Sequence, residues 1–277
     1  MSAILNKKLL SAVLLAGAGA VSNNAMAVVF PDFTVNEGAV AGAVANTFTA
    51  DKITGNYVEV VTFNVNGTFS ASIEWSAGQF VANDGTTPVG TQLGGNPLIS
   101  PNDYNMYALI QANGTFTTSG AGVTTFSFLP GGAFSLYIDA GQDTTFTAPG
   151  SGNVAWGTTP TTADNLVGTG AAISGQGTLD PNLTTCTGGG GGGINCGSFG
   201  TNISFNLSAF GKTYFTNPNP FFNATFQSGQ LNNFSPTGTQ TINGSLDVVF
   251  GNVPEPDSLA LLGLGLMGFG LSRRKKA

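Results

Sequence analysis

Few side chains in this sequence could support catalysis, because the chain contains no histidine. Without imidazole, Ser-His-Asp and Cys-His nucleophilic sites are excluded, as are histidine-ligated metal centres. Carboxylate pairs remain, and Glu59 with Glu74 or Asp139 with Asp143 could formally hydrolyse a glycosidic bond. No motif marks either pair. We therefore expect no catalytic residues and no enzyme, with a secreted glycan hydrolase as the least favoured alternative.

The two aspartates could instead bind a cation. Asp139 and Asp143 are separated by Ala-Gly-Gln, and carboxylates in such a turn could supply oxygen ligands for calcium. The spacing departs from the D-x-[DN]-x-[DN]-G pattern of calcium-binding loops. We expect no cofactor, and calcium at Asp139 and Asp143 is the alternative to solvated loop carboxylates.

Cys186 and Cys196 are the only cysteines, and between them lies a run of six glycines, Gly188 to Gly193. In an exported chain this arrangement predicts a disulfide that closes the loop. A redox or metal-binding pair would need C-x-x-C spacing or further soft ligands, and the sequence has neither. The surrounding stretch, about residues 148–200, is rich in Gly, Thr, Pro and Ser, and we interpret it as a Gly-rich excursion.

The elements that must position these residues are predicted to be β-strands. Phe69, Ala71 and Ile73 alternate with polar residues, at the period of a strand with one buried face. Asn66-Gly67 and Asn113-Gly114 have the composition of hairpin turns, and Asp84-Gly85 that of a loop. Candidate strands cover residues 57–65, 68–75, 106–111, 115–118, 124–129, 134–140, 203–210, 221–226 and 245–250. This pattern favours an all-β fold, an antiparallel β-sandwich with a jelly-roll as one arrangement.

The 21 phenylalanines are expected to pack in the core of this sandwich. The alternative is a platform on which sugars stack, and Trp75, Trp156 and Tyr214 are the rings that would be exposed for it. One domain over residues 28–253 is favoured over two smaller β domains, because such a span is within range for a sandwich.

Charge excludes one class of partner. Only 8% of the 277 residues are charged, where a typical soluble domain has about 25%. Six of the eight basic residues lie near the termini, so residues 28–253 contain two basic and twelve acidic side chains, a net charge of −10. A body this acidic repels phosphate backbones, which argues against nucleic-acid binding.

The N-terminus has the composition of a secretory signal peptide. Residues 1–27 contain Lys7 and Lys8, then an apolar run, and then Ala25-Met26-Ala27. A basic start, a short apolar segment and an A-x-A cleavage site are typical of such peptides. We expect cleavage after Ala27, with Ala25 and Ala27 as the recognised small residues.

The C-terminus has a second signal. Pro254-Glu255-Pro256 precedes an uncharged segment, 258–271, and then a basic cluster that includes Arg273 and Arg274. Such a cluster stays on the cytoplasmic side and leaves the preceding domain outside. As a short membrane helix the segment would reach about 21 Å, less than the roughly 30 Å hydrocarbon core, so it indicates transient inner-membrane anchoring.

Residues 254–277 resemble the PEP-CTERM sorting signal of Gram-negative bacteria, since the Pro-Glu-Pro tripeptide, the apolar segment and the basic end occur in the required order. The resemblance implies processing by the membrane protease exosortase near Pro254, Glu255 and Pro256. It also implies export across the inner membrane and delivery to the cell surface or extracellular matrix.

A second resemblance lies near the start of the expected mature chain. The stretches Phe30-Pro31-Asp32-Phe33-Thr34-Val35-Asn36-Glu37-Gly38 and Asn46-Thr47-Phe48-Thr49-Ala50-Asp51-Lys52-Ile53 are similar to the flocculation-associated PEP-CTERM proteins. This resemblance implies a role in holding cells and exopolysaccharide together in flocs or biofilm. The expected partners are exopolysaccharide or cell-surface glycans, and the alternative is a self-associating structural matrix protein without a sugar site.

Overall fold

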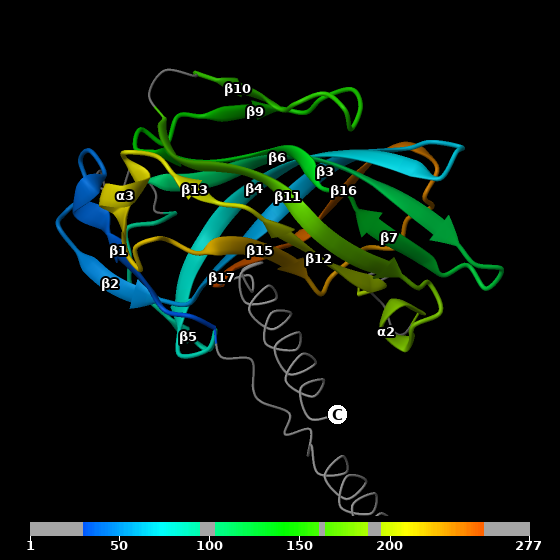
Figure 1. Cartoon of the computed structure of the whole chain (residues 1–277), viewed down its shortest axis with the longest axis horizontal. Helices are drawn as coiled ribbons and strands as arrows, with labels where there is room; N and C mark the ends of the chain where they lie inside the picture. The colour runs from blue at the N-terminus through cyan, green and yellow to red at the C-terminus, as the bar shows by residue number, and fades with distance from the viewer. Residues whose placement is uncertain (1–29, 95–102, 161–163, 188–194, 252–277) are drawn as a thin grey trace, which may run out of the picture.

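The computed structural model describes residues 30–94, 103–160, 164–187 and 195–251 (Figure 1). Strands account for 58% of the structure and helices for 5%. The named strands pair in antiparallel fashion throughout these residues, so the all-β antiparallel prediction is confirmed.

The strands form three sheets, one of twelve strands, one of three and one of two. In chain order they are β1 (Phe33–Asn36), β2 (Thr47–Ala50), β3 (Lys52–Phe63), β4 (Thr68–Ala82), β5 (Thr87–Pro88), β6 (Asn105–Thr118), β7 (Thr124–Phe128), β8 (Gly131–Asp139), β9 (Thr145–Thr147), β10 (Gly157–Thr159), β11 (Asn165–Leu179), β12 (Gly197–Ile203), β13 (Asn206–Leu207), β14 (Phe215–Asn217), β15 (Asn223–Ser228), β16 (Gly238–Ser245) and β17 (Asp247–Gly251). The helical segments are η1 (Glu37–Ala39), α2 (Thr184–Thr187) and α3 (Gly211–Tyr214).

None of the helices in these described residues is long and apolar enough to cross a membrane. The membrane helix expected near the C-terminus, at residues 258–271, lies outside the described residues.

The large sheet closes on itself. Eight strands pair in the order β3, β4, β6, β8, β11, β12, β15 and β17, and β17 pairs again with β3. Figure 1 shows β4, β6 and β11 above β12, β15 and β17. The two layers expected of a sandwich are therefore parts of one continuous sheet.

Aromatic side chains fill the space between the layers. Along β3 the odd-numbered residues, among them Tyr57, Val61 and Phe63, are buried on the inner face. Trp75 is fully buried, and its ring lies edge-on to Phe226 across the core at 5.9 Å. The prediction that aromatic rings form the core is confirmed, and Trp75 is excluded as an exposed ring.

Two of the three predicted turns are present. Gly67 follows β3 with φ 79° and Gly85 follows β4 with φ 71°, both in the left-handed region that glycine adopts without strain. The turn predicted at Asn113-Gly114 is wrong, because both residues lie inside β6. Gly114 is needed there for close packing, since a Cβ would lie 2.4 Å from the ring of Phe69.

The Gly-rich stretch 148–200 contains more regular structure than an excursion would. It includes the whole of β11, which pairs with β7, β8, β12 and β13. A Cβ at Gly168 would lie 2.5 Å from the ring of Phe205, and one at Gly177 would lie 2.8 Å from Phe199. Glycine is therefore used in β11 because neighbouring strands approach it closely. The disulfide predicted between Cys186 and Cys196 is present in the same region.

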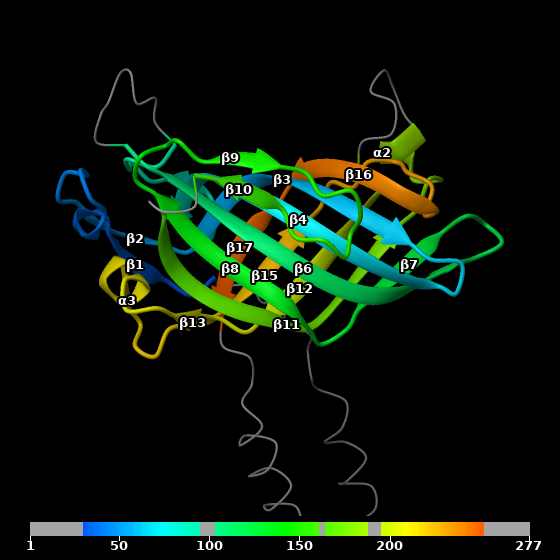
Figure 2. The same cartoon turned by 90° about the horizontal axis from the view of Figure 1, so that it is seen from above.

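Smaller elements cover the outer face of the large sheet. Figures 1 and 2 show the β9–β10 pair lying across this face, over β6. Trp156, in the connection between β9 and β10, donates from its indole nitrogen to the Ser72 carbonyl oxygen at 3.0 Å. Phe146 packs edge-on against Tyr107 at 5.0 Å.

One end of the molecule is closed by the β14–β1–β2 sheet, η1 and α3. Glu37 is fully buried there, and its carboxylate accepts hydrogen bonds from Asn46, Gln92 and Tyr104. The Tyr104 and Tyr214 hydroxyls are 2.6 Å apart, and burial raises the pKa of both tyrosines well above the ordinary value. The network fastens α3 to the large sheet and excludes Tyr214 as an exposed ring.

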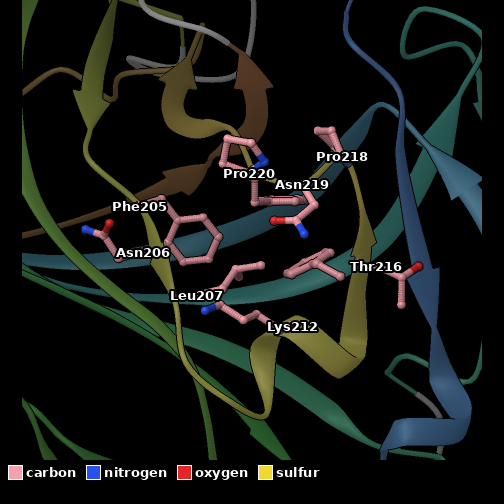
Figure 3. Close-up of a pocket in the computed structure, with 10 residues that line it drawn as sticks. Phe205, Asn206, Leu207, Lys212, Thr216, Pro218, Asn219 and Pro220 are labelled. Carbon is pink, nitrogen blue, oxygen red and sulfur yellow. The ribbon is translucent and has the colours of Figure 1, made fainter.

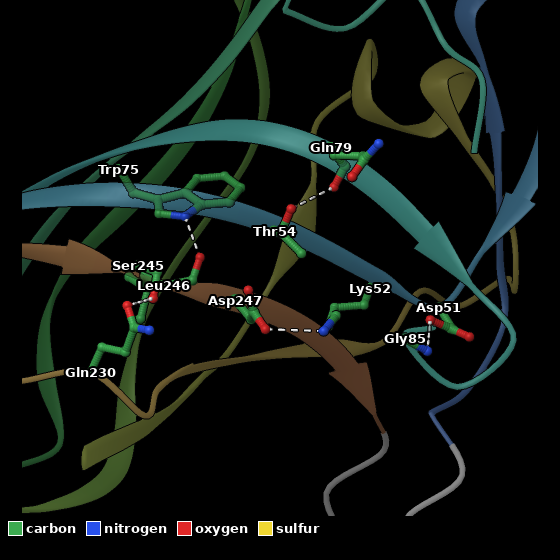
Figure 4. A network of polar contacts seen from close by, with 10 residues as sticks. All are labelled: Asp51, Lys52, Thr54, Trp75, Gln79, Gly85, Gln230, Ser245, Leu246 and Asp247. Carbon is green, nitrogen blue, oxygen red and sulfur yellow. Dashed lines mark hydrogen bonds and ion pairs between the residues drawn. The ribbon is translucent and has the colours of Figure 1, made fainter. Parts of the chain in front are cut away.

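The closing seam runs along one edge of β3 (Figure 4). β16 pairs with residues 56–63 of β3, and β17 pairs with residues 52–53. Between them, the Leu246 N–H donates to the Gly55 carbonyl at 2.9 Å, and the Trp75 indole N–H donates to the Leu246 carbonyl at 2.8 Å. Both backbone groups of Leu246 are thus paired at the break.

Residue 55 is glycine because β4 approaches it closely from the side opposite the seam. A Cβ at this position would lie 2.4 Å from the Ser76 carbonyl oxygen and 2.5 Å from the Trp75 indole nitrogen. Beside it, Lys52 forms an ion pair with Asp247 at 3.1 Å, also drawn in Figure 4.

We expect the substitution Trp75→Phe to lower the free energy of unfolding by about 3 kcal/mol, because it leaves the buried Leu246 carbonyl without a donor and removes part of a core ring. Urea unfolding measures this loss. The matched control is Trp156→Phe, which removes an indole donor from a half-buried site and should cost about 1 kcal/mol. Equal losses in the two variants would contradict the special role of the seam.

Candidate functional site

A cleft of about 300 Å³ lies beside α3, between β13 and the segment that follows β14 (Figure 3). Its lining residues are Phe205, Asn206, Leu207, Lys212, Phe215, Thr216, Pro218, Asn219, Pro220 and Phe221. The volume is at the lower end of the roughly 300–1,000 Å³ typical of small-ligand sites.

The floor of the cleft is aromatic and firmly held. Phe205 and Phe215 are almost fully buried. Phe221 packs against both, at 6.0 Å from Phe205 and 4.9 Å from Phe215, and it also contacts Phe250 of β17 at 5.1 Å. The floor is thus continuous with the core of the closed sheet, which fixes the position of the rings.

The rim of the cleft is polar and exposed. Asn206, Lys212, Thr216 and Asn219 are all solvent-exposed, and Figure 3 shows the Asn219 side chain across the cleft from the Phe205 ring. The peptide bonds before Pro218 and Pro220 are cis, and these prolines flank Asn219. Sugar hydroxyls form hydrogen bonds with amide, hydroxyl and ammonium groups, and the apolar face of a sugar ring packs on an aromatic floor.

Lys212 is the one positive charge free to meet a ligand among the described residues. The only other lysine there, Lys52, is paired with Asp247, whereas Lys212 forms no ion pair within the described chain. No carboxylate lines the cleft. The arrangement can bind a hydroxyl-rich or acidic ligand, and it offers no acid and base pair for hydrolysis.

Sequence reasoning did not identify this cleft. The rings that it proposed for stacking, Trp75 and Tyr214, are buried, and Trp156 is half-buried with its indole nitrogen bonded to the Ser72 carbonyl. One available signal was the isolated Lys212 in an acidic body. Another was the sequence Asn217-Pro218-Asn219-Pro220, in which two prolines interrupt any regular strand.

The structure separates the first of the predicted carboxylate pairs. Glu59 is opposite Ile73 in the β3–β4 ladder, and Glu74 is opposite Val58. Because neighbouring residues of a strand point to opposite faces, Glu59 faces the core and Glu74 faces outward. Glu74 accepts a hydrogen bond from Ser76. These two carboxylates cannot flank one glycosidic bond.

Glu59 lies in an apolar pocket inside the sheet, lined mainly by phenylalanines from β3, β4, β7 and β12. The side chain is 8% exposed, and no described residue donates a hydrogen bond to it. Burial raises the pKa of Glu59 to about 7, and burial also raises the pKa of Glu74. Leu231 and Phe234 also line the pocket, and Phe234 stacks on Phe63 at 5.9 Å.

The second predicted pair stays together. Asp139 is the last residue of β8 and is buried, while Asp143 is exposed in the turn that follows. The Asp139 Oδ2 accepts a hydrogen bond from the Thr144 N–H at 3.0 Å. Within the described residues, no group of three or more acidic or cysteine side chains is arranged to hold a metal ion.

The predicted sorting and cleavage residues lie outside the described residues. They are Ala25 and Ala27 at the N-terminus, and Pro254, Glu255, Pro256, Arg273 and Arg274 at the C-terminus.

Comparison with known proteins identifies the C-terminal segment. Residues 252–275 match the family model of the PEP-CTERM protein-sorting motif, a span that includes Pro254, Glu255, Pro256, Arg273 and Arg274. The resemblance of the C-terminus to this signal is confirmed. No curated protein and no solved structure matches the chain significantly.

Glu59 makes the stability depend on pH. Its pKa is about 7 in the folded protein, against an ordinary value of 4.5, so the folded state binds the proton more tightly. Stability should therefore fall as pH rises from about 4.5 to about 7, by a total on the order of 3 kcal/mol.

The substitution Glu59→Gln should remove this pH dependence and raise the free energy of unfolding at pH 7.5. Urea unfolding at several pH values measures both effects, and Asp32→Asn, a change at an exposed carboxylate, is the control. An unchanged pH profile in Glu59→Gln would show that Glu59 is not the group that titrates.

Proposed function

We propose that this protein promotes floc or biofilm formation by associating with exopolysaccharide, and that the cleft beside α3 is its sugar site. The sorting motif indicates an exported, exosortase-processed surface protein, and contact with extracellular polymers is compatible with that destination. The similarity of residues 30–38 and 46–53 to flocculation-associated proteins supports the same process.

The observation that carries the proposal is the combination of an aromatic floor and a polar rim in the cleft. Rings that are fixed by the core form its floor, and exposed amide, hydroxyl and ammonium groups form its rim, of which only the Thr216 hydroxyl has a partner within the described residues, the Thr34 carbonyl at 3.5 Å. Sugars bind through the apolar faces of their rings together with hydrogen bonds from their hydroxyls, and this cleft offers both kinds of contact. The absence of a carboxylate from its lining favours binding over hydrolysis.

The alternative of self-association through an edge strand has less support. β16 pairs with β3 on one side, and the segment 229–237 lies along its other side. Asn232 donates to the Asn243 carbonyl at 3.1 Å, and the Ser245 hydroxyl donates to the Gln230 side chain at 2.9 Å. These contacts occupy part of the edge that a second copy would need.

The test uses the protein purified in its processed form. It measures how much of this protein is retained on exopolysaccharide isolated from the same bacterium. We expect the double variant Lys212→Gln, Asn219→Ala to bind about thirtyfold more weakly, since each of the two lost polar contacts costs about 1 kcal/mol. Asn233→Ala removes an exposed amide that does not line the cleft but a separate hollow beside Thr118 and Pro181, and this variant should bind like the unchanged protein.

Retention that is equal in all three proteins would contradict the assignment of the cleft. No retention at all, together with oligomers that grow with protein concentration, would instead favour the self-associating matrix protein. Release of reducing sugar from the polysaccharide would restore the hydrolase alternative.

A further inference from the structure

The carboxylate of Asp139 has an unsatisfied oxygen in the interior. The side chain is 1% exposed, and its Oδ2 accepts the Thr144 N–H. Its Oδ1 is buried and has no hydrogen-bond partner. A buried carboxylate oxygen without a donor is costly, so such an atom indicates a missing positively charged or hydrogen-bonding partner.

A second carboxylate faces the same place. The position that a Cβ of Gly141 would occupy is 3.7 Å from the Asp139 Oδ1 and 3.2 Å from the Asp143 Oδ1. Because residue 141 is glycine, no side-chain atom occupies this position near the two oxygens. One oxygen of the buried carboxylate and one oxygen of the exposed carboxylate thus lie within 4 Å of the same point in the turn.

A third carboxylate near the turn, that of Asp164, has hydrogen-bond donors of its own. Thr144 donates through its hydroxyl to Asp164, at 3.1 Å from Oδ1 and 3.0 Å from Oδ2, and Tyr107 donates to the Asp164 Oδ2 at 2.5 Å. Asp164 therefore has its own donors. Both lysines of the described chain, Lys52 and Lys212, are accounted for elsewhere, at the seam and in the cleft.

We propose that the turn from Asp139 to Asp143 binds one calcium ion. Asp139 Oδ1 and Asp143 Oδ1 are the two protein carboxylate ligands. Calcium binds roughly six to eight oxygen ligands, and backbone carbonyls and water can supply those that carboxylates do not. Two carboxylates in a turn are therefore enough for a site of modest affinity. This site is separate from the sugar cleft and does not depend on the function proposed for it.

The experiment uses the processed protein after treatment with a chelator, and calcium chloride is the only addition. Isothermal titration should show one ion bound per chain, and calcium should raise the melting temperature by several degrees, because the ion binds only the folded state. Magnesium should compete poorly, since it requires a smaller and more regular shell of ligands.

Three variants locate the site. Asp143→Asn removes an exposed ligand and should weaken calcium binding at least tenfold with little effect on the fold. Gly141→Ala places a methyl group in the space between the carboxylates and should weaken binding as well. Asp139→Asn should abolish binding and also raise the melting temperature of the calcium-free protein, because it removes a buried carboxylate whose Oδ1 has no donor.

Asp32→Asn is the control, since it removes an equal charge at an exposed position and should leave binding unchanged. The proposal is overturned if the unchanged protein binds no calcium, or if Asp143→Asn and Gly141→Ala both bind it normally. If Asp139→Asn does not fold, the other two variants still decide the question.

Discussion

The edge of β3 is the constraint on which the rest of the structure depends. The first residues of β3 pair with β17, and its later residues pair with β16. Both partners come from much later in the chain, since Lys52 and Asp247, which form an ion pair here, are 195 residues apart. Only when this edge is paired do the two layers face each other across a dry core. Trp75 lies at the break between β16 and β17 and satisfies the one carbonyl that neither ladder can reach.

The closed sheet decides which polar groups can act together. Glu59 and Glu74 come from adjacent strands, yet the pleat sends them to opposite faces, one into a pocket of phenylalanines and the other outward. Asp139 and Asp143 remain neighbours because a turn, and not a strand, connects them. The cleft in turn obtains its rigid floor from Phe221, which rests on the ring of Phe250 in the closing strand.

The sequence was informative where alternation and turn chemistry act locally. The period of Phe69, Ala71 and Ile73 predicted the buried face of β4, and Asn66-Gly67 predicted the turn before it. Two features depend on distant parts of the chain and could not be predicted in this way. Glycine in β11 indicates a loop by propensity, but its role is to admit the Phe205 ring and the neighbouring strands. Lys212 becomes part of a cleft only because α3 is fastened beside β14 through buried tyrosines.

The position of the closing strand has a consequence for biogenesis. A chain that is threaded through a membrane from its N-terminus releases β3 early and β17 last, and β17 ends at Gly251, one residue before the sorting motif begins. The closed sheet cannot be completed until that final segment has emerged, because before then β15 and the first residues of β3 lack the strand that joins them. The last strand of the fold and the sorting motif therefore reach the membrane together. When exosortase meets the motif, all strands of the β domain have already been exported and can pair.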